Sequence, residues 1–159
     1  MNLPKANPLF LRDADLREAI ELLFFGYRDF TGEADAMLAD YGFGRAHHRV
    51  IYFVGAQQGL SVSDLLATLK VTKQSLSRVL SQLIEEDIVE QRTDEKDRRR
   101  RLLFLTAKGR DLEAALTERQ SALISKAYRS AGADAVAGFR TVLLGIINEH
   151  DRRRFDERD

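Results

Sequence analysis

The feature that most constrains this chain is the position of its prolines. Both of them, Pro4 and Pro8, fall within the first eight of 159 residues. Proline disrupts a helix interior because it lacks a backbone N–H and clashes with the preceding turn, so no later position is barred from a helix. Apolar side chains then recur at helical spacing over residues 13–41, which predicts one long helix. These side chains are Leu16, Ile20, Leu23, Phe24, Tyr27, Phe30, Ala34, Met37 and Tyr41, with Gly26 and Gly32 as possible bends.

Two short amphipathic segments follow a second predicted helix that spans about Arg45 to Gln57. Ser61 and Asp64 have the spacing of a capping box, and the apolar face behind them comprises Val62, Leu65, Leu66 and Leu69. Residues 70–72 then lead into a second segment, whose apolar face comprises Leu76, Val79, Leu80, Leu83 and Ile84. Two short helices joined by so tight a break predict a helix-turn-helix. The opposite side of the second helix is small, polar and partly cationic, with Lys73, Gln74, Ser77, Arg78 and Ser81.

The apolar period next changes from 3.6 residues to about two. IVEQR (residues 88–92) and RLLFLT (residues 101–106) are typical of short strands, and TDEKDRRR between them is typical of a hairpin tip. Helical spacing resumes after Thr106, a good N-cap, and continues to Gly132. A last helix turns Val136, Phe139, Leu143, Ile146 and Ile147 inward and ends in Arg152–Arg154, where cations complement the helix dipole. The fold predicted is mostly α with a small β-hairpin wing: a winged helix-turn-helix with N- and C-terminal helical arms.

The charges of the chain balance overall but are unevenly placed. There are 25 basic and 25 acidic residues, yet residues 13–40 hold eight acids against two bases, and residues 92–101 hold six bases against three acids. A run of four arginines is by itself most often a solvated face, and the flanking acids disfavour a nuclear-localisation signal. A hairpin beside a recognition helix can reach the next groove, however, and a narrow minor groove accepts guanidinium groups. The arginine block is therefore predicted to face DNA, with Asp94, Glu95 and Asp97 holding particular arginines.

The segment from Ser61 to Gly109, SVSDLLATLKVTKQSLSRVLSQLIEEDIVEQRTDEKDRRRRLLFLTAKG, resembles the MarR family of bacterial winged-helix transcription regulators. Its most specific part is DRRRRLLFLTAKG, which matches the family's wing motif at Asp97, Arg99, Leu105, Thr106 and Gly109. The resemblance implies a homodimer that binds a pseudo-palindromic operator in double-stranded DNA. It also implies one domain, residues 1–159, in which residues 1–57 and 107–159 form a helical dimerisation region and residues 61–106 form the DNA-binding lobe.

The resemblance further implies roles for particular residues. Arg78 is the best candidate for a base contact, because Arg–guanine pairing is the commonest specific contact. The other recognition-helix residues expected in the major groove are Lys73, Gln74, Ser75 and Ser77. Arg99 matches the wing arginine expected in the minor groove, with Asp97 orienting it, while Arg98, Arg100 and Arg101 contact phosphate or pack on the hairpin. The sequence departs from the family where glycine usually flanks the recognition helix, since Lys70 and Asp87 stand there.

Many members of this family release DNA when a small aromatic or anionic ligand binds. The corresponding stretch here is GRAHHRVIYF, and the candidate pocket comprises Tyr27, Arg45, His47, His48 and Tyr52. Adjacent helical residues point about 100° apart, so the two histidines do not line one pocket equally well. The alternatives are a structural role, with one histidine packed and the other solvated or paired with an acid of the first helix, or a metal or pH-sensing role. The aromatic stripe Phe24, Phe25, Tyr27 and Phe30 favours core or dimer packing over a ligand cage.

Other classes of function find little support in the sequence. The chain has no cysteine, its histidines at 47, 48 and 150 lack metal-ligand spacing, and it has neither a P-loop nor a GxSxG motif. We therefore expect no enzyme activity, metal or cofactor. No apolar run approaches the ~20 residues of a membrane span, and the first 15 residues lack a signal-peptide apolar region, so a cytoplasmic protein without a membrane partner is expected. The rival functions are a winged helix that mainly binds protein and a DNA-binding factor without a ligand.

Overall fold

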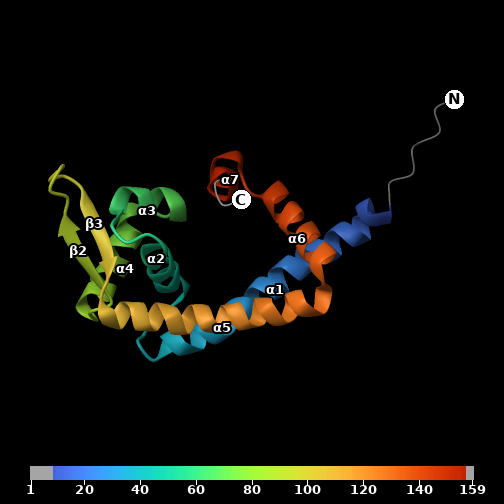
Figure 1. Cartoon of the computed structure of the whole chain (residues 1–159), viewed down its shortest axis with the longest axis horizontal. Coiled ribbons are helices and arrows are strands. Elements are labelled where there is room, and N and C mark those ends of the chain that lie inside the picture. The colour runs from blue at the N-terminus through green and yellow to red at the C-terminus, as the bar shows by residue number, and fades with distance from the viewer. Residues whose placement is uncertain (1–8, 157–159) are drawn as a thin grey trace. The chain divides into compact units, whose positions relative to one another are not determined.

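The computed structural model describes residues 9–156 and confirms a mostly helical chain with a small antiparallel sheet (Figure 1). Pro4, Pro8 and most of the stretch tested for a signal peptide lie outside the described residues. The elements, in order, are a 3-10 turn at Leu9–Leu11, α1 Asp13–Ala39, α2 Arg45–Ala56, β1 Leu60–Ser61, α3 Val62–Leu69, α4 Lys73–Glu85, β2 Val89–Thr93, β3 Arg101–Leu105, α5 Ala107–Ala131, α6 Ala133–Ile146 and α7 Glu149–Asp156.

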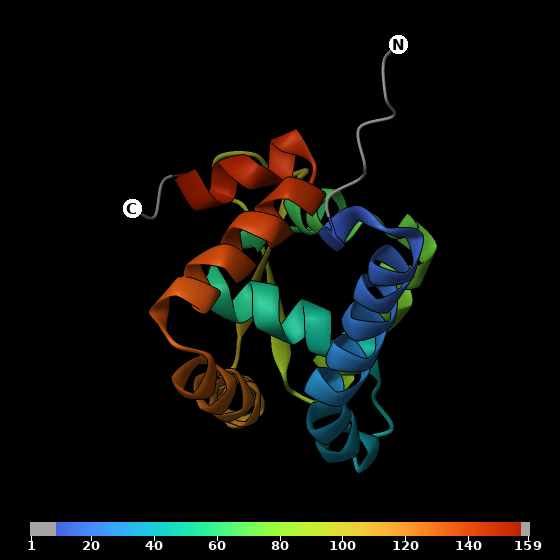
Figure 2. The ribbon, with the colours of Figure 1, turned by 90° about the vertical axis from the view of Figure 1, so that its right-hand side faces the viewer.

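The chain divides into two compact units, residues 1–120 and 121–159, and the boundary falls inside α5. In the first unit, α1 is a continuous helix in which neither Gly26 nor Gly32 causes a break, and α2 packs against it (Figure 2). Within residues 9–156 no helix combines the length and the apolar character that crossing a bilayer requires.

The predicted helix-turn-helix is present as α3 and α4, and both helices begin at side-chain caps. The Ser61 hydroxyl accepts a hydrogen bond from the Asp64 N–H at 3.0 Å, and the Thr72 hydroxyl accepts one from the Ser75 N–H at 3.1 Å. Lys70 and Asp87 occupy left-handed backbone conformations, with φ of 52° and 56°. The two turns therefore have the backbone geometry that glycine normally supplies, although neither residue is glycine. A left-handed conformation costs a non-glycine residue ~1–2 kcal/mol relative to glycine.

The wing is a three-stranded antiparallel sheet in the order β1-β3-β2. The predicted hairpin of β2 and β3 is confirmed, with Val89 opposite Leu105 and Thr93 opposite Arg101. The sequence did not predict β1, which has only two residues and pairs Leu60 with Leu103. Alternation along β3 buries Leu103 and Leu105, and these join one core with the apolar faces of α2, α3, α4 and α5.

Thr106 and Gly109 fix the junction between the wing and α5. The Thr106 N–H donates to the Ile88 carbonyl at 3.0 Å, and the Thr106 hydroxyl accepts from the Gly109 N–H at 3.0 Å, which confirms the predicted N-cap. A Cβ atom at position 109 would lie 2.0 Å from the Ile88 carbonyl oxygen. The Thr-x-x-Gly spacing of the wing motif therefore has a physical reason: the threonine caps the helix and the glycine allows the backbone of Ile88 to approach it.

The C-terminal unit differs from the prediction of one last helix ending in Arg152–Arg154. The helix α6 ends at Ile146 because Ile147 is extended, with φ −66° and ψ 139°, and Asn148 starts a new helix. The Asn148 side-chain oxygen accepts from the Asp151 N–H at 3.0 Å, as an N-cap asparagine does. The arginines therefore belong to the short helix α7, with Arg153 and Arg154 in its last turn.

The close contact at position 109 gives a stability prediction. We expect Gly109→Ala to lower the free energy of unfolding by about 1–3 kcal/mol, because the added methyl group meets backbone and not a flexible side chain. The matched control is Gly32→Ala, at another helical glycine, where an added methyl group would meet nothing within 4 Å among the described residues. It should stabilise the protein by about 0.5–1 kcal/mol. Urea unfolding at one protein concentration measures both, and equal stability of the two variants would contradict the account.

Candidate nucleic-acid interface

One side of α4 is buried and the other is exposed and polar. Leu76, Val79, Leu80 and Leu83 are buried, whereas the five residues predicted to contact DNA are all exposed: Lys73, Gln74, Ser75, Ser77 and Arg78. Ser75 has a second role, because its hydroxyl accepts from the Thr72 hydroxyl at 2.8 Å beside the N-cap. The helix thus presents a cationic, hydrogen-bonding face whose first turn is fixed by its own cap.

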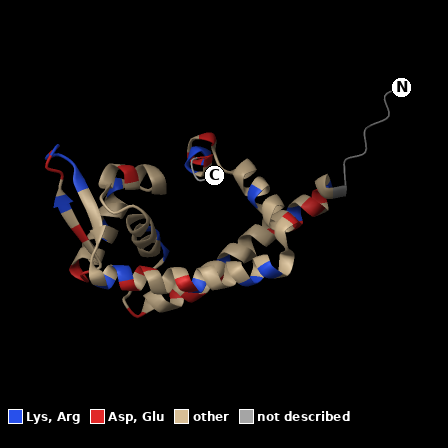
Figure 3. Cartoon of the chain, in the orientation of Figure 1, with Lys and Arg blue, Asp and Glu red and all other residues tan. Residues whose placement is uncertain are grey.

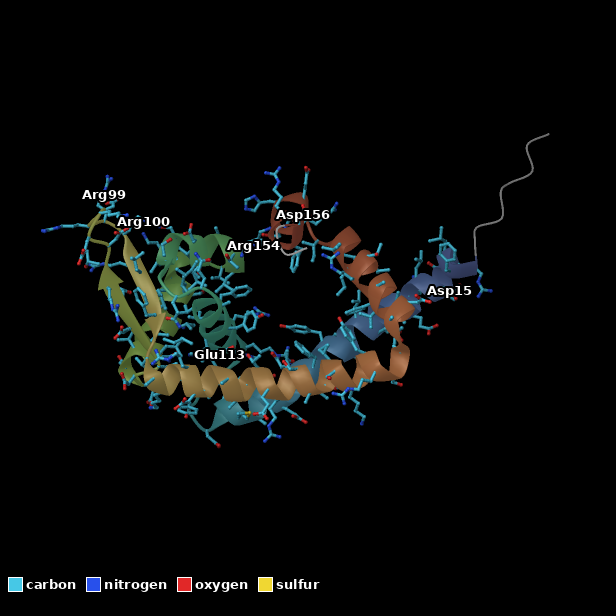
Figure 4. All side chains as sticks on the ribbon, in the orientation of Figure 1. Asp15, Arg99, Arg100, Glu113, Arg154 and Asp156 are labelled. Atoms are coloured by element: carbon cyan, nitrogen blue, oxygen red, sulfur yellow. The ribbon has the colours of Figure 1, made fainter. Side chains whose placement is uncertain are left out.

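The tip of the β2–β3 hairpin is organised by two aspartates. The Asp97 carboxylate accepts from the backbone N–H of Arg99 at 3.1 Å and from its guanidinium Nε at 3.2 Å. These hydrogen bonds from Arg99 hold the pKa of Asp97 below its ordinary value. The Arg99 side chain is nevertheless 92% exposed and lies at the tip (Figure 4). Asp97 therefore sets the direction of Arg99 without removing its charge from solvent.

The other arginines of the block have different surroundings. Arg100 lies 3.4 Å from the Asp94 carboxylate and 3.9 Å from that of Asp64 on α3. Arg101 donates to the Thr93 hydroxyl at 2.8 Å across the strand pair, and Arg98 is exposed. Asp94 and Asp97 thus hold particular arginines, as predicted. Figure 3 shows the resulting basic cluster at the hairpin tip.

A groove of about 510 Å³ separates α4 from the hairpin. Its polar lining comes from four elements and the hairpin tip: Ser63 of α3, Lys73, Ser77 and Ser81 of α4, Gln91 of β2, Arg101 of β3, and Arg99 and Arg100 of the tip. Among the described residues that line it there are four cations and no carboxylate. A groove of this composition attracts a polyanion, even though the whole chain is electrically neutral.

A second, smaller cavity of about 120 Å³ lies between α1, α2 and the first part of α5. It brings together four of the five residues predicted for a ligand pocket, Tyr27, Arg45, His48 and Tyr52, and adds Phe30, Thr31, Arg49, Phe53 and Gln120. The Arg49 guanidinium donates to the Tyr27 hydroxyl at 3.1 Å, and the Arg45 guanidinium lies 5.6 Å from the Tyr27 ring centroid. Two guanidinium groups thus flank one tyrosine in this cavity.

His47 does not line this cavity, which corrects the prediction for that residue. Neighbouring positions on a helix point about 100° apart, and His47 faces α4, where its Nε2 lies 2.6 Å from the Gln82 side-chain oxygen. No local sequence signal indicated this partner, which is 35 positions away. Phe43, whose ring stacks on that of His47, was likewise not predicted to belong to any site.

His48 is buried on the cavity side of α2. Burial lowers the pKa of His48 from 6.5, and the nearby carboxylates of Asp35 and Glu113 oppose that effect (Figure 4 labels Glu113 on α5). One oxygen of Asp35 accepts from Arg45 at 3.0 Å, while the other is buried and has no hydrogen-bond partner among the described residues. The neutral form of His48 is therefore the one that the folded chain favours.

Comparison with known proteins identifies the family of this chain. The MarR family model matches residues 41–100. The chain is also 48% identical over 147 residues to the HTH-type transcriptional regulator PetP of Rhodobacter capsulatus, covering 92% of this chain and 89% of that protein. This chain belongs to the MarR family of winged-helix transcriptional regulators.

Solved structures of MarR-family regulators share the fold. The crystal structure of MarR has a TM-score of 0.66 at 19% identity and covers 98% of this chain and 99% of its own. Streptococcus pneumoniae FabT, solved in complex with DNA, has a TM-score of 0.74 at 20% identity and covers 83% of this chain and 94% of its own. At these identities the likeness concerns the fold alone.

The burial of His48 gives a pH prediction. The unfolded chain binds a proton at His48 near pH 6.5, whereas the folded chain binds it only at lower pH. The free energy of unfolding should therefore be fully retained above pH 6.5 and should fall as the pH is lowered from there toward the pKa of the folded state. Glutamine in His48→Gln cannot take up that proton. Urea unfolding between pH 5 and 8 should therefore show that the variant loses less free energy of unfolding at low pH than the wild type does. A constant difference between the two proteins across that range would refute the prediction.

Proposed function

We propose that this MarR-family regulator binds a pseudo-palindromic operator in double-stranded DNA as a homodimer. The observation that carries the proposal is the groove between α4 and the wing, whose described lining holds four cations and no acid. DNA binding requires such a surface, because neutralising phosphates supplies most of the affinity. The FabT structure in complex with DNA and the S. aureus MepR–DNA complex support it by analogy of fold.

The recognition helix and the wing then have separate tasks. The exposed face of α4 enters the major groove, where Arg78 pairs with a base edge and Lys73, Gln74, Ser75 and Ser77 make the neighbouring contacts. Arg99, directed by Asp97, enters the minor groove. Arg98 and Arg100 contact phosphate, which fixes the register of the protein on the duplex and adds no sequence information.

Exposed apolar side chains support the homodimer. They concentrate on α1 and on α6, and include Leu16, Ile20, Leu23, Phe24 and Tyr27 on the former and Phe139, Val142 and Ile146 on the latter. Apolar faces of this extent mark interaction sites. A second copy of the chain is the partner that a pseudo-palindromic operator needs, with residues 1–57 and 107–159 as the dimerisation region and 61–106 as the DNA-binding lobe.

The cavity between α1 and α2 is the proposed effector site. Its volume of about 120 Å³ is close to the ~150 Å³ of an engineered cavity that binds benzene, so a single-ring molecule is the appropriate size. Arg45 and Arg49 favour a carboxylate on that ring, since guanidinium groups bind carboxylates with two parallel hydrogen bonds. A small aromatic acid is therefore the effector class that relieves DNA binding.

The DNA proposal is tested by selecting fragments of the source genome with purified protein, run in parallel with Arg99→Ala. Wild type should enrich a near-palindrome with half-sites about one helical turn apart, and light scattering should give the mass of two chains. Arg99→Ala should lose at least about tenfold in affinity for the enriched duplex, while Arg153→Ala on α7 should not. Affinity should also fall steeply with salt. Enrichment of no fragment, or equal loss in both variants, would overturn the proposal; salt-insensitive capture of a protein would favour the rival protein-binding function.

The effector proposal is tested with the same duplex and a panel of benzoate derivatives. At least one should raise the apparent Kd for DNA in the wild-type protein. Arg49→Ala should need at least about tenfold more of that compound, because a charge-assisted hydrogen bond contributes ~1.5–3 kcal/mol. Arg129→Ala, which does not line the cavity, is the control. If no compound acts, or if both variants respond like wild type, the cavity is not the effector site.

A further inference from the structure

The C-terminal half of the recognition helix α4 is held by side chains from two other helices. The His47 ring on α2 lies 2.6 Å from the Gln82 side-chain oxygen through its Nε2 atom. Lys108 on α5 donates through Nζ to the backbone carbonyl of Glu86, the residue after the last of α4, at 2.8 Å. The opposite side of α4 packs through its buried apolar face, so these two hydrogen bonds are directional contacts that apolar packing does not provide.

The surroundings of His47 select one tautomer of its ring. The Gly44 N–H points at Nδ1, at 3.0 Å. A backbone N–H can only donate, so Nδ1 must be the unprotonated acceptor and Nε2 must carry the hydrogen. Nε2 then donates to the Gln82 side-chain oxygen. A single neutral imidazole therefore caps the N-terminus of α2 and also reaches α4, and it can do both only in this tautomer.

A stack of rings connects His47, which contacts Gln82, with Lys108, which contacts the Glu86 carbonyl. The Phe43 ring lies 4.5 Å from that of His47 with an interplanar angle of 14°, and the Tyr41 ring lies 5.5 Å from that of Phe43 with an angle of 13°. The Lys108 Nζ atom lies 5.8 Å from the centroid of Tyr41. Lys108, Tyr41, Phe43 and His47 thus form a continuous series from the start of α5, through the α1–α2 loop, to Gln82 on α4. We name this series the ring strut.

The position of Gln82 bears directly on the face of α4 that is proposed to read DNA. Gln82 follows Arg78 by four residues, so the two side chains are neighbours on the helix surface. A rotation or slide of α4 that releases Gln82 from His47 displaces Arg78 with it. Recognition of a base edge tolerates displacements of only about 0.5 Å, so a contact that fixes this part of the helix affects affinity without itself touching DNA.

We propose that His47 is a positioning residue for operator binding: in its Nε2–H tautomer it holds Gln82 and so fixes α4 for contact with DNA. This inference rests on the proposed DNA-binding function. It assigns to His47 a role different from the ligand pocket predicted from the sequence, and it gives a function to Gln82 and to the ring strut, which the DNA-contact residues leave unexplained.

The chain offers variants that separate this role from helix capping. His47→Asn keeps an acceptor near the position of Nδ1 for the Gly44 N–H, but its side chain is too short to place a donor at the position of Nε2 for Gln82. Gln82→Leu removes the acceptor and leaves the cap intact. Gln57→Leu, an equal change at an exposed position outside the strut and the groove, is the control.

The test is a double-mutant cycle on affinity for the duplex that wild type enriches from its genome. Each single variant should bind that duplex about two- to tenfold more weakly, the net value of one hydrogen bond. The double variant should be no weaker than the weaker single variant, because both substitutions remove the same contact. Melting temperatures of the variants, measured first, establish that the proteins are folded. Nitrogen-15 NMR of wild type at pH 8, where histidine is ordinarily neutral, should show a protonated Nε2 and an unprotonated Nδ1 for His47, independently of any variant.

Each outcome decides between the two proposals. Additive losses, unchanged affinity in the single variants, a loss equal to that of Gln57→Leu, or the opposite tautomer would overturn the role of His47 while leaving DNA binding in place. If wild type enriches no duplex, the proposed function fails and the role of His47 in operator binding fails with it, even where NMR and melting confirm the contact itself.

Discussion

The contact between the Ile88 carbonyl and Gly109 is the constraint on which the DNA-binding part of this protein depends. Ile88 directly precedes β2, Thr106 directly follows β3, and Gly109 lies in the first turn of α5, so both ends of the hairpin meet at this point. Thr106 also caps the start of α5, and the left-handed residue Asp87 ends the turn after α4. A side chain at position 109 would separate these elements. The contact at Gly109 therefore fixes the position of the hairpin relative to the recognition helix.

The uneven placement of charges, and not the total charge, produces a basic surface in this part of the protein. The chain is neutral overall, yet acids concentrate along α1 and cations along the groove between α4 and the wing. The acids near the wing tip have a different purpose: Asp97 directs Arg99, while Asp94 and Asp64 approach Arg100. Arginines of the same run thus differ in freedom, and we infer that they differ in task, with Arg99 reading the groove and Arg100 fixing the register.

The helix α2 lies between the cavity proposed for an effector and the recognition helix α4. Successive residues of α2 serve different surfaces: Arg45 and His48 line the cavity, whereas His47 extends to α4. A helix that lines the cavity on one side and contacts the recognition helix on the other is suited to link the two. The ring strut contacts α4 through His47 and does not line the cavity, so α2 itself is the element that the two sites share.

The sequence by itself determined the features that depend on neighbouring residues. Helical spacing, the caps at Ser61 and Thr106, and the change to a period of two predicted the helix-turn-helix and the wing, because these signals act within a few residues. Only the tertiary structure revealed what depends on distant partners: the two-residue strand β1, the burial of His48, and the hydrogen bond between His47 and Gln82. Two adjacent histidines look alike in sequence. Their roles differ because the helix turns them toward different neighbours, and only the folded chain decides which neighbours those are.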